Sequence, residues 1–201
     1  MARPRLISDD AIREAARLVF VQDGPGAPVS RVAERLGVSH AALFARVGTK
    51  EQLLREALGP GRPPALAALA EDPPELGAHA RLVQILRELM VFLERAVPSL
   101  VVLKASGVSL ASKREAPPVA LRRALSRWLS RAVELGAAAP MDAGAVAEGL
   151  LGAMEARCFN AYLGGVTHAP GDDLAFLDAL VAGLVPAART AGRPPRKGRR
   201  R

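Results

Sequence analysis

The sequence has few of the residues on which several classes of protein depend. It contains one cysteine, Cys158, so no disulfide can form within the chain. Aromatic residues make up only 3% of the composition, and no sustained alternation of apolar and polar residues is present. Alanine and leucine dominate instead, and both favour helices. The sequence therefore excludes a disulfide-stabilised scaffold and predicts an all-α fold.

Long apolar segments are also missing. No run approaches the roughly 18 to 20 residues that a helix needs to span a bilayer. The most apolar stretch, "LVQILRELMVFL", is interrupted by Arg87 and Glu88. The N-terminal "MARPRLISDDAIREAARLVF" lacks the continuous apolar stretch of a signal peptide. We therefore expect a cytoplasmic protein with no membrane partner.

The net charge of +8 is unevenly distributed along the chain. Residues 1–58 hold nine Lys and Arg against seven Asp and Glu, and residues 59–188 hold twelve against thirteen. Residues 189–201, "RTAGRPPRKGRRR", hold seven cations and no anion. This tail lacks apolar periodicity, so we expect it to be disordered. The basic composition is therefore no argument that the folded part binds nucleic acid.

Four short helices are predicted in the first 58 residues, because apolar residues recur there at i, i+3 and i+4. Each has a capping residue before it or a glycine after it. They cover about residues 10–20 (capped by Ser8 or Asp9), 29–36 (followed by Gly37), 40–47 (capped by Ser39, followed by Gly48) and 50–58 (capped by Thr49). The third is barely two turns long and marginal alone, so its neighbours must hold it.

The chain beyond the helix-breaking "GPGRPP" of residues 59–64 is predicted to be helical. After a short helical "ALAALA", the expected helices cover about residues 76–96, 98–111, 117–138, 142–163 and 172–189. We expect three regions: a domain of residues 1–58, a helical domain of residues 59–188 and the tail of residues 189–201.

The short third helix fits the second helix of a helix-turn-helix. That motif needs a small residue where the helices cross, a tight turn between them and a buried apolar anchor. Ala33, Gly37 and Leu43 supply these three features. With Leu43 facing the core, Ala41 and Ala45 point away from it and are free to meet DNA. A helical hairpin packed in a bundle is the alternative interpretation.

Three motifs connect this region to a known family: "A-x3-F-x3-G" from Ala16 to Gly24, "VAERLGVS" at residues 32–39 and "LF-x4-TKEQLL" at residues 43–54. Through them, residues 7–58 resemble the N-terminal domain of the TetR family of bacterial transcriptional regulators. The resemblance covers about a quarter of the chain, and the helical remainder is compatible with the family but carries no motif. It implies an N-terminal three-helix helix-turn-helix domain followed by a helical ligand-binding and dimerisation domain.

The resemblance assigns the helix that ends at Gly48 to DNA recognition and the lysine matching Lys50 to a phosphate. A cation and free N–H groups at a helix N-terminus suit an anion, although a solvated surface lysine is also possible. His40 is the only polar candidate for a base contact, and an idle surface histidine is the alternative. Arg46 stands where the family often has an aromatic residue, and we assign it to phosphate. The predicted DNA-binding residues are Ser39, His40, Ala41, Ala42, Phe44, Ala45, Arg46 and Lys50.

The sequence also departs from the family. Ala27 and Pro28 stand where a hydroxyl residue is usual, Pro25 where an aromatic is usual, and "LFARV" where "LYHYF" is typical. Two hydroxyls that contact phosphate are therefore missing, at Pro28 and Phe44. The alanines offer only methyl groups, which can meet a thymine methyl but cannot form hydrogen bonds with base edges, so sparse base readout is expected.

The family plan further implies a ligand cavity among the C-terminal helices and a dimer interface on the last two long ones. These two helices have broad apolar faces with small residues, although a monomeric core looks similar. Polar or bulky residues on otherwise apolar helices are the ligand candidates, and each also fits an ordinary core or surface role. They are Met90, Phe92, Trp128, Met154, Arg157, Cys158 and Tyr162.

Arg157 is notable among these candidates because a cation midway along an apolar helix needs an anionic partner. A ligand carboxylate is one option, and the protein's own candidates are Glu94, Glu134 and Glu155. Cys158 and His168 share a region, but no acid or oxyanion loop accompanies them. Glycine-rich phosphate loops and metal-ligand spacings are not recognisable. We therefore expect no enzyme activity and no cofactor.

Together these features predict a DNA-binding transcriptional regulator, expected to act as a repressor. It would bind a palindromic double-stranded DNA operator as a homodimer and respond to an unknown small-molecule effector. A helical protein-interaction module whose basic tail binds acidic partners is one alternative. A helical enzyme that transforms a small molecule is another.

Overall fold

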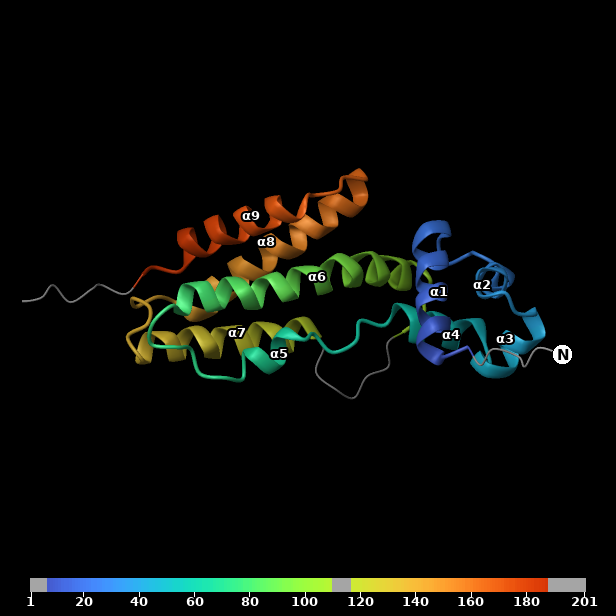
Figure 1. Ribbon diagram of the computed structural model, residues 1–201, viewed down its shortest axis with the longest axis horizontal. Coiled ribbons are helices and arrows are strands. Elements are labelled where there is room, and N and C mark those ends of the chain that lie inside the picture. Colours follow the sequence, from blue (N-terminus) through green and yellow to red (C-terminus); the bar gives the residue numbers. More distant parts are fainter. Residues whose placement is uncertain (1–6, 110–116, 188–201) are drawn as a thin grey trace, which may run out of the picture.

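The computed structural model describes residues 7–109 and 117–187, and within these residues the chain is helical (Figure 1). No strand occurs in these ranges. An isolated β-bridge joins Ala138 and Ala187. The predicted all-α fold class is confirmed. The helices are α1 (Asp9–Asp23), α2 (Val29–Leu36), α3 (His40–Val47), α4 (Lys50–Leu58), α5 (Ala65–Ala68), α6 (Ala78–Ala105), α7 (Pro117–Glu134), α8 (Ala143–Gly164) and α9 (Pro170–Leu184).

The helices form an elongated molecule with α1–α4 at one end and α5, α7, α8 and α9 towards the other (Figure 1). The long helix α6 joins the two ends, because it contacts α1 and α4 as well as α5, α8 and α9. Among the described helices, none combines the length and apolarity that crossing a lipid bilayer requires. The N-terminal helices and the rest of the fold are thus connected through a single continuous helix.

Buried apolar side chains form two clusters. One, which we call the N-terminal cluster, joins α1–α4 and is centred on large, fully buried side chains such as Phe20 and Leu53. The other joins α5–α9 around residues such as Leu86 and Leu129. α6 contributes to both, because its C-terminal Val102 and Leu103 lie in the first cluster. A movement of α6 relative to α1–α4 would therefore disturb packed side chains, which are intolerant of small shifts.

The helix starts of the N-terminal region follow the predicted caps. Ser8, Ser39 and Thr49 each accept a hydrogen bond from the backbone N–H three residues later, at 3.1, 3.2 and 3.0 Å. Such a cap is worth about 1 kcal/mol. For short helices such as α3 and α4, each of these bonds is a substantial fraction of the local stability.

The turn between α2 and α3 depends on Gly37, which adopts the left-handed conformation with φ of 68°. Its N–H donates to the Glu34 carbonyl at 3.1 Å, and the Val38 N–H donates to the Ala33 carbonyl at 3.0 Å. This pair of bonds is the Schellman motif, and it satisfies carbonyls that the end of α2 leaves free. The predicted role of Gly37 in the turn is confirmed.

The predicted division of residues 76–111 into two helices is wrong. α6 continues through Pro98 as one helix. Proline removes one backbone hydrogen bond and costs about 3 kcal/mol inside a helix. Burial on both sides of it, from Leu93 and Ala96 to Val102 and Leu103, offsets that cost. Nearby, the buried Ser99 hydroxyl donates to the Arg95 carbonyl at 2.8 Å.

The ends of the last helices differ by a few residues from the predicted ones. α7 ends at Glu134 rather than near residue 138, since Gly136 takes a φ of 71° that a helix does not allow. α9 begins earlier and ends earlier than predicted, at Pro170 and Leu184. The predicted disordered tail, residues 189–201, lies outside the described residues.

Candidate functional site

The short helix α3 has one buried face and one exposed face. Leu43 and Val47 are 1% and 5% exposed and belong to the N-terminal cluster. Ala41, Ala42 and Ala45 are exposed on the other side. The predicted orientation of the helix is therefore confirmed. We call these three residues the alanine face of α3.

α3 is held by its neighbours rather than by its own length. It contacts α2 on one side and α4 on the other, and Gly48 ends it with a φ of 71°. Its first turn carries His40, whose ring lies 4.5 Å from the Phe44 ring, centroid to centroid, at an angle of 51°. Phe44 in turn packs on the N-terminal cluster. His40 is therefore exposed but rests on a supported aromatic side chain.

Arg46 has partners within the chain that the sequence did not indicate. Its guanidinium donates to the carbonyl of Ile7 and to the carboxylate of Asp9, at the start of α1. The side chain is 40% exposed. Arg46 thus braces α3 against α1 while staying accessible to solvent.

Lys50 begins α4 and points towards the turn that precedes α2. Its ammonium donates to the Gly26 carbonyl at 3.1 Å and lies 5.9 Å from the centre of the Phe20 ring. Hydrogen bonding and cation–π attraction hold the positive charge beside the turn that precedes α2. The predicted DNA-binding residues, all between residues 39 and 50, therefore lie on α3, its cap and the first turn of α4.

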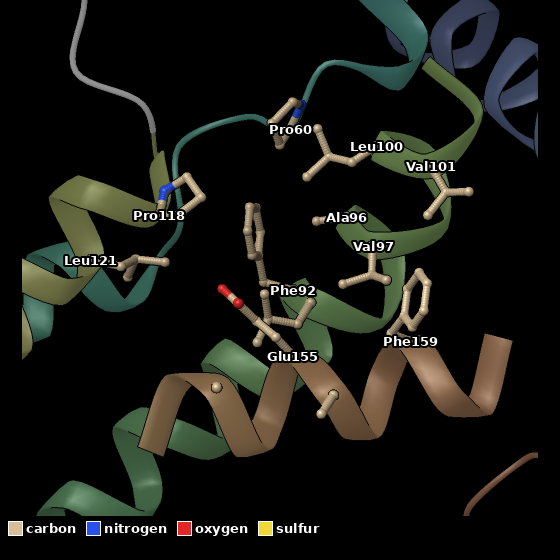
Figure 2. A pocket seen from close by; sticks show the side chains of 13 residues that line it. Pro60, Phe92, Ala96, Val97, Leu100, Val101, Pro118, Leu121, Glu155 and Phe159 are labelled. Carbon is tan, nitrogen blue, oxygen red and sulfur yellow. The ribbon is translucent and has the colours of Figure 1, made fainter. Parts of the chain in front are cut away.

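An apolar cavity of about 460 Å³ lies between α6, α7 and α8 (Figure 2). We call it the α6–α8 cavity. Glu155 of α8 is the one charged residue among those that line it, and Figure 2 shows its carboxylate directed into the cavity. The walls include Phe92, Ala96, Val97 and Leu100 of α6, Leu121 of α7 and Phe159 of α8, with Pro60 at one edge.

Burial raises the pKa of the Glu155 carboxyl above its ordinary value. Two charged groups lie near enough to act on it, and they oppose each other: Arg122 lowers this pKa and Glu148 raises it. Arg122 is itself paired with Glu148 at 2.5 Å. The carboxyl of Glu155 thus stays without a dedicated counter-ion.

Residues 12–57 match the family model described as "Bacterial regulatory proteins, tetR family". The matched segment runs from α1 almost to the end of α4 and contains the whole helix-turn-helix. These residues form a tetR-family domain. The domain of α1–α4 is therefore a DNA-binding domain, and the protein is a DNA-binding transcriptional regulator. No curated protein sequence matches the chain.

Several solved structures share the fold of this chain. A tetR-family regulatory protein from Rhodococcus RHA1 is 22% identical, with a TM-score of 0.62, and the match covers 90% of this chain and 100% of that one. NalD, the secondary repressor of the MexAB-OprM multidrug efflux pump in Pseudomonas aeruginosa, is 17% identical, with a TM-score of 0.59 and coverages of 88% and 95%. A TetR-family transcriptional regulator from Pectobacterium atrosepticum is 18% identical, with a TM-score of 0.54 and coverages of 90% and 95%. At these identities the likeness establishes the fold alone.

The seven ligand candidates predicted from the sequence do not come together in one cavity. Phe92 alone lines the α6–α8 cavity. Trp128 and Met154 are 3% and 0% exposed and belong to the core of α5–α9. The remaining four line a second hollow of about 330 Å³ between α6, α8 and the start of α9, which we call the α9 cleft: Met90, Arg157, Cys158 and Tyr162.

The anionic partner of Arg157 is Asp173, on α9. The two side chains lie 2.8 Å apart and are 19% and 16% exposed. The guanidinium also lies 4.7 Å from the centre of the Phe176 ring. None of the three expected glutamates forms an ion pair with Arg157, although Glu94 lies close enough for Arg157 to lower its pKa. Glu134 pairs with Arg131 at 3.0 Å, and Glu155, two residues before Arg157, lines the other cavity.

Burial raises the pKa of two side chains of the α9 cleft, Glu94 and Cys158. For the Glu94 carboxyl, the nearby Asp173, which shares a hydrogen bond with it, adds to the shift, and His168 and Arg157 oppose it. Cys158 is 6% exposed, and its sulfur lies 3.5 Å from that of Met90. Burial raises the pKa of this thiol to about 11, so it is protonated at neutral pH.

Glu155 lines the α6–α8 cavity, whereas the sequence predicts it only as a possible partner for Arg157. The criterion that selected Arg157, a charge midway along an apolar helix, applies equally to Glu155. Residues two apart on a helix point in different directions. This spacing indicates that Glu155 and Arg157 face different hollows.

Proposed function

We propose that this regulator is a repressor that binds a palindromic operator as a homodimer and leaves it when a small-molecule effector fills the α6–α8 cavity. Residues 1–58 would form the DNA-binding domain and residues 59–188 the effector-binding and dimerisation domain. The observation that carries the DNA-binding part is the alanine face of α3, exposed opposite the buried Leu43 and Val47.

The alanine face lets α3 approach the floor of the major groove closely, since no long side chain stands between the helix and the bases. Ala41, Ala42 and Ala45 would meet thymine methyl groups, and His40 would supply the polar base contact. The remaining proposed contacts to the DNA backbone come from Ser39, Arg46 and Lys50, while Phe44 would support the ring of His40. Phosphate contacts of this kind fix the register of the protein on the duplex but carry no sequence information.

The dimer would form through α8 and α9, where large apolar side chains are exposed. Phe159, Leu163, Val166 and Leu174 are 43%, 65%, 54% and 41% exposed, and all lie on these helices or on the loop between them. Exposed large apolar side chains on two neighbouring helices favour a protein–protein interface. Two copies related by a two-fold axis would present two α3 helices to two half-sites.

The response to an effector would travel through α6. Phe92 and Ala96 line the α6–α8 cavity and also a crevice of about 850 Å³ between α6, α1 and α4. An effector that pushes on Phe92 therefore acts on a residue at the boundary of the DNA-binding domain. It shifts the equilibrium only if it binds the non-DNA-binding arrangement more tightly.

The decisive experiment is a matched pair of alanine-to-glutamate variants. Duplexes selected from a randomised pool by the wild-type protein serve as the operator. Ala45→Glu should abolish binding, because a carboxylate then faces the DNA, while thermal unfolding stays nearly unchanged. Ala67→Glu, on the exposed side of α5, should bind like the wild type. Full affinity of Ala45→Glu, or failure of the wild type to select any duplex, would reject the proposal.

A further inference from the structure

The wall of the α6–α8 cavity is apolar except at one point. Phe92, Leu100, Leu121 and Phe159 provide large apolar surfaces, and Glu155 projects a carboxylate among them (Figure 2). A binding site of this kind obtains affinity from apolar contact and orientation from its few polar groups. The charge and hydrogen bonding of the Glu155 carboxyl group therefore decide which apolar molecules the cavity binds.

Glu155 has no partner of its own in the described part of the chain. No described residue donates a hydrogen bond to it or forms an ion pair with it. Arg122, the nearby cation, is engaged with Glu148, so these three side chains together carry one net negative charge. A carboxylate in apolar surroundings is costly unless it is paired. A ligand that supplied a positive charge would remove this cost.

The charged groups of the α9 cleft provide an instructive contrast. There the cation and the anion are already joined, because Arg157 pairs with Asp173 at 2.8 Å, and Glu94 shares a hydrogen bond with the same aspartate. Each of these two carboxyl groups therefore already has an ion-pair or hydrogen-bond partner within the cleft, which Glu155 lacks in the described part of the chain. Of these two hollows, the α6–α8 cavity is the one whose carboxyl group has no hydrogen-bond or ion-pair partner among the described residues.

We propose that the effector of the α6–α8 cavity is a small organic cation with an apolar body, whose charged nitrogen lies against the Glu155 carboxylate. The proposal rests on the ligand response proposed above and adds the chemical class of the ligand. The volume of about 460 Å³ lies within the range of small-molecule sites and accommodates an alkyl chain or a fused-ring body with one ammonium group. An anion of the same shape is disfavoured, because it would meet the net negative charge.

Three probes that share a ten-carbon alkyl chain and differ in the charge of the head group test this directly: decylammonium, decanol and decanoate. Calorimetric titration of the full-length protein should rank decylammonium first, about tenfold tighter than decanol, with decanoate weakest. In Glu155→Gln the advantage of decylammonium over decanol should disappear, while decanol binds as in the wild type. The matched control is Glu94→Gln, which removes a carboxylate from the α9 cleft and should leave the ranking unchanged.

The pH dependence provides a second readout that a merely structural role of Glu155 would not produce. Decylammonium binds the ionised carboxylate, so its affinity should fall as acidification protonates Glu155, and binding should release a proton. Arg122 and Glu148, which also face this carboxyl, stay paired with each other. Decanol affinity, and decylammonium affinity for Glu155→Gln, should change far less over the same pH range.

The outcomes separate this inference from the proposed function. Equal affinities for the three probes, or a preference for decylammonium that survives in Glu155→Gln, overturn the cation assignment. Release of selected DNA by decanol as readily as by decylammonium would also overturn it while supporting a ligand-responsive regulator. Tight decylammonium binding that leaves the DNA complex intact would instead support the cation site and count against ligand-induced release.

Discussion

The guanidinium of Arg95 on α6 lies 2.7 Å from the carboxylate of Glu14 on α1. Glu14 also accepts from Arg17 at 2.7 Å, and the hydrogen bond from Arg17 lowers the pKa of the Glu14 carboxyl, so the link is ionised at neutral pH. Arg95 is the immediate neighbour of Ala96, which lines the α6–α8 cavity. A polar contact therefore joins the cavity-bearing helix to the DNA-binding domain.

We predict that Arg95→Gln weakens the effector response more than it weakens DNA binding. The side chains are 61% and 44% exposed, so losing the pair should cost less than about 1 kcal/mol of unfolding free energy. The cavity ligand that releases DNA from the wild type should then be needed at higher concentration, measured by fluorescence anisotropy of labelled operator. Arg81→Gln breaks an α6 ion pair with Glu71 and should behave like the wild type. An unchanged response in Arg95→Gln would contradict this coupling role.

We also predict that the single thiol is inert in the folded protein. With the pKa of Cys158 raised to about 11, on the order of one thiol in a thousand is ionised at pH 8. Alkylation by iodoacetamide should therefore be about two orders of magnitude slower in the native than in the unfolded chain, and should accelerate as pH rises towards 11. Rapid native alkylation, followed by mass spectrometry, would show that the thiol is neither buried nor protonated and would revive a nucleophilic role.

The proposed dimer is tested by placing a charge on its apolar surface. Leu163→Glu should convert the dimer to a monomer in light scattering at micromolar concentration, because a buried unpaired carboxylate destabilises an interface. Since Leu163 is 65% exposed in the single chain, the monomer should keep its fold by circular dichroism. Leu76→Glu, at a 91% exposed position outside α8 and α9, should remain dimeric. A wild-type protein that is monomeric throughout would reject the interface and the palindromic operator together.

The local features were predictable from sequence because they depend on residues close together in the chain. The caps at Ser8, Ser39 and Thr49 and the turn at Gly37 involve partners within five residues. The same holds for the two faces of α3, which follow from helical periodicity.

The pairings between distant residues were not predictable in this way. Arg157 could be assigned a need for an anion, but its choice of Asp173 depends on how α8 and α9 pack. Likewise, local rules placed a break at Pro98, and the break is absent because α6 is buried on both sides of it. Sequence alone therefore specified much of the DNA-binding helix and little of the cavity.

Arg46 can serve as a brace within the protein or as a phosphate contact, and Asp9 provides a way to separate the two. Asp9→Asn removes the carboxylate that Arg46 binds, and Asp10→Asn is the matched control, since Asp10 pairs with Arg13 instead. If Arg46 reaches a phosphate, Asp9→Asn should free it and steepen the slope of log K against log salt by up to about 0.9 per subunit. Asp10→Asn removes the same charge one residue away and should leave the slope unchanged. Equal slopes for the two variants, together with a lower melting temperature for Arg46→Ala, would limit Arg46 to bracing α3 against α1.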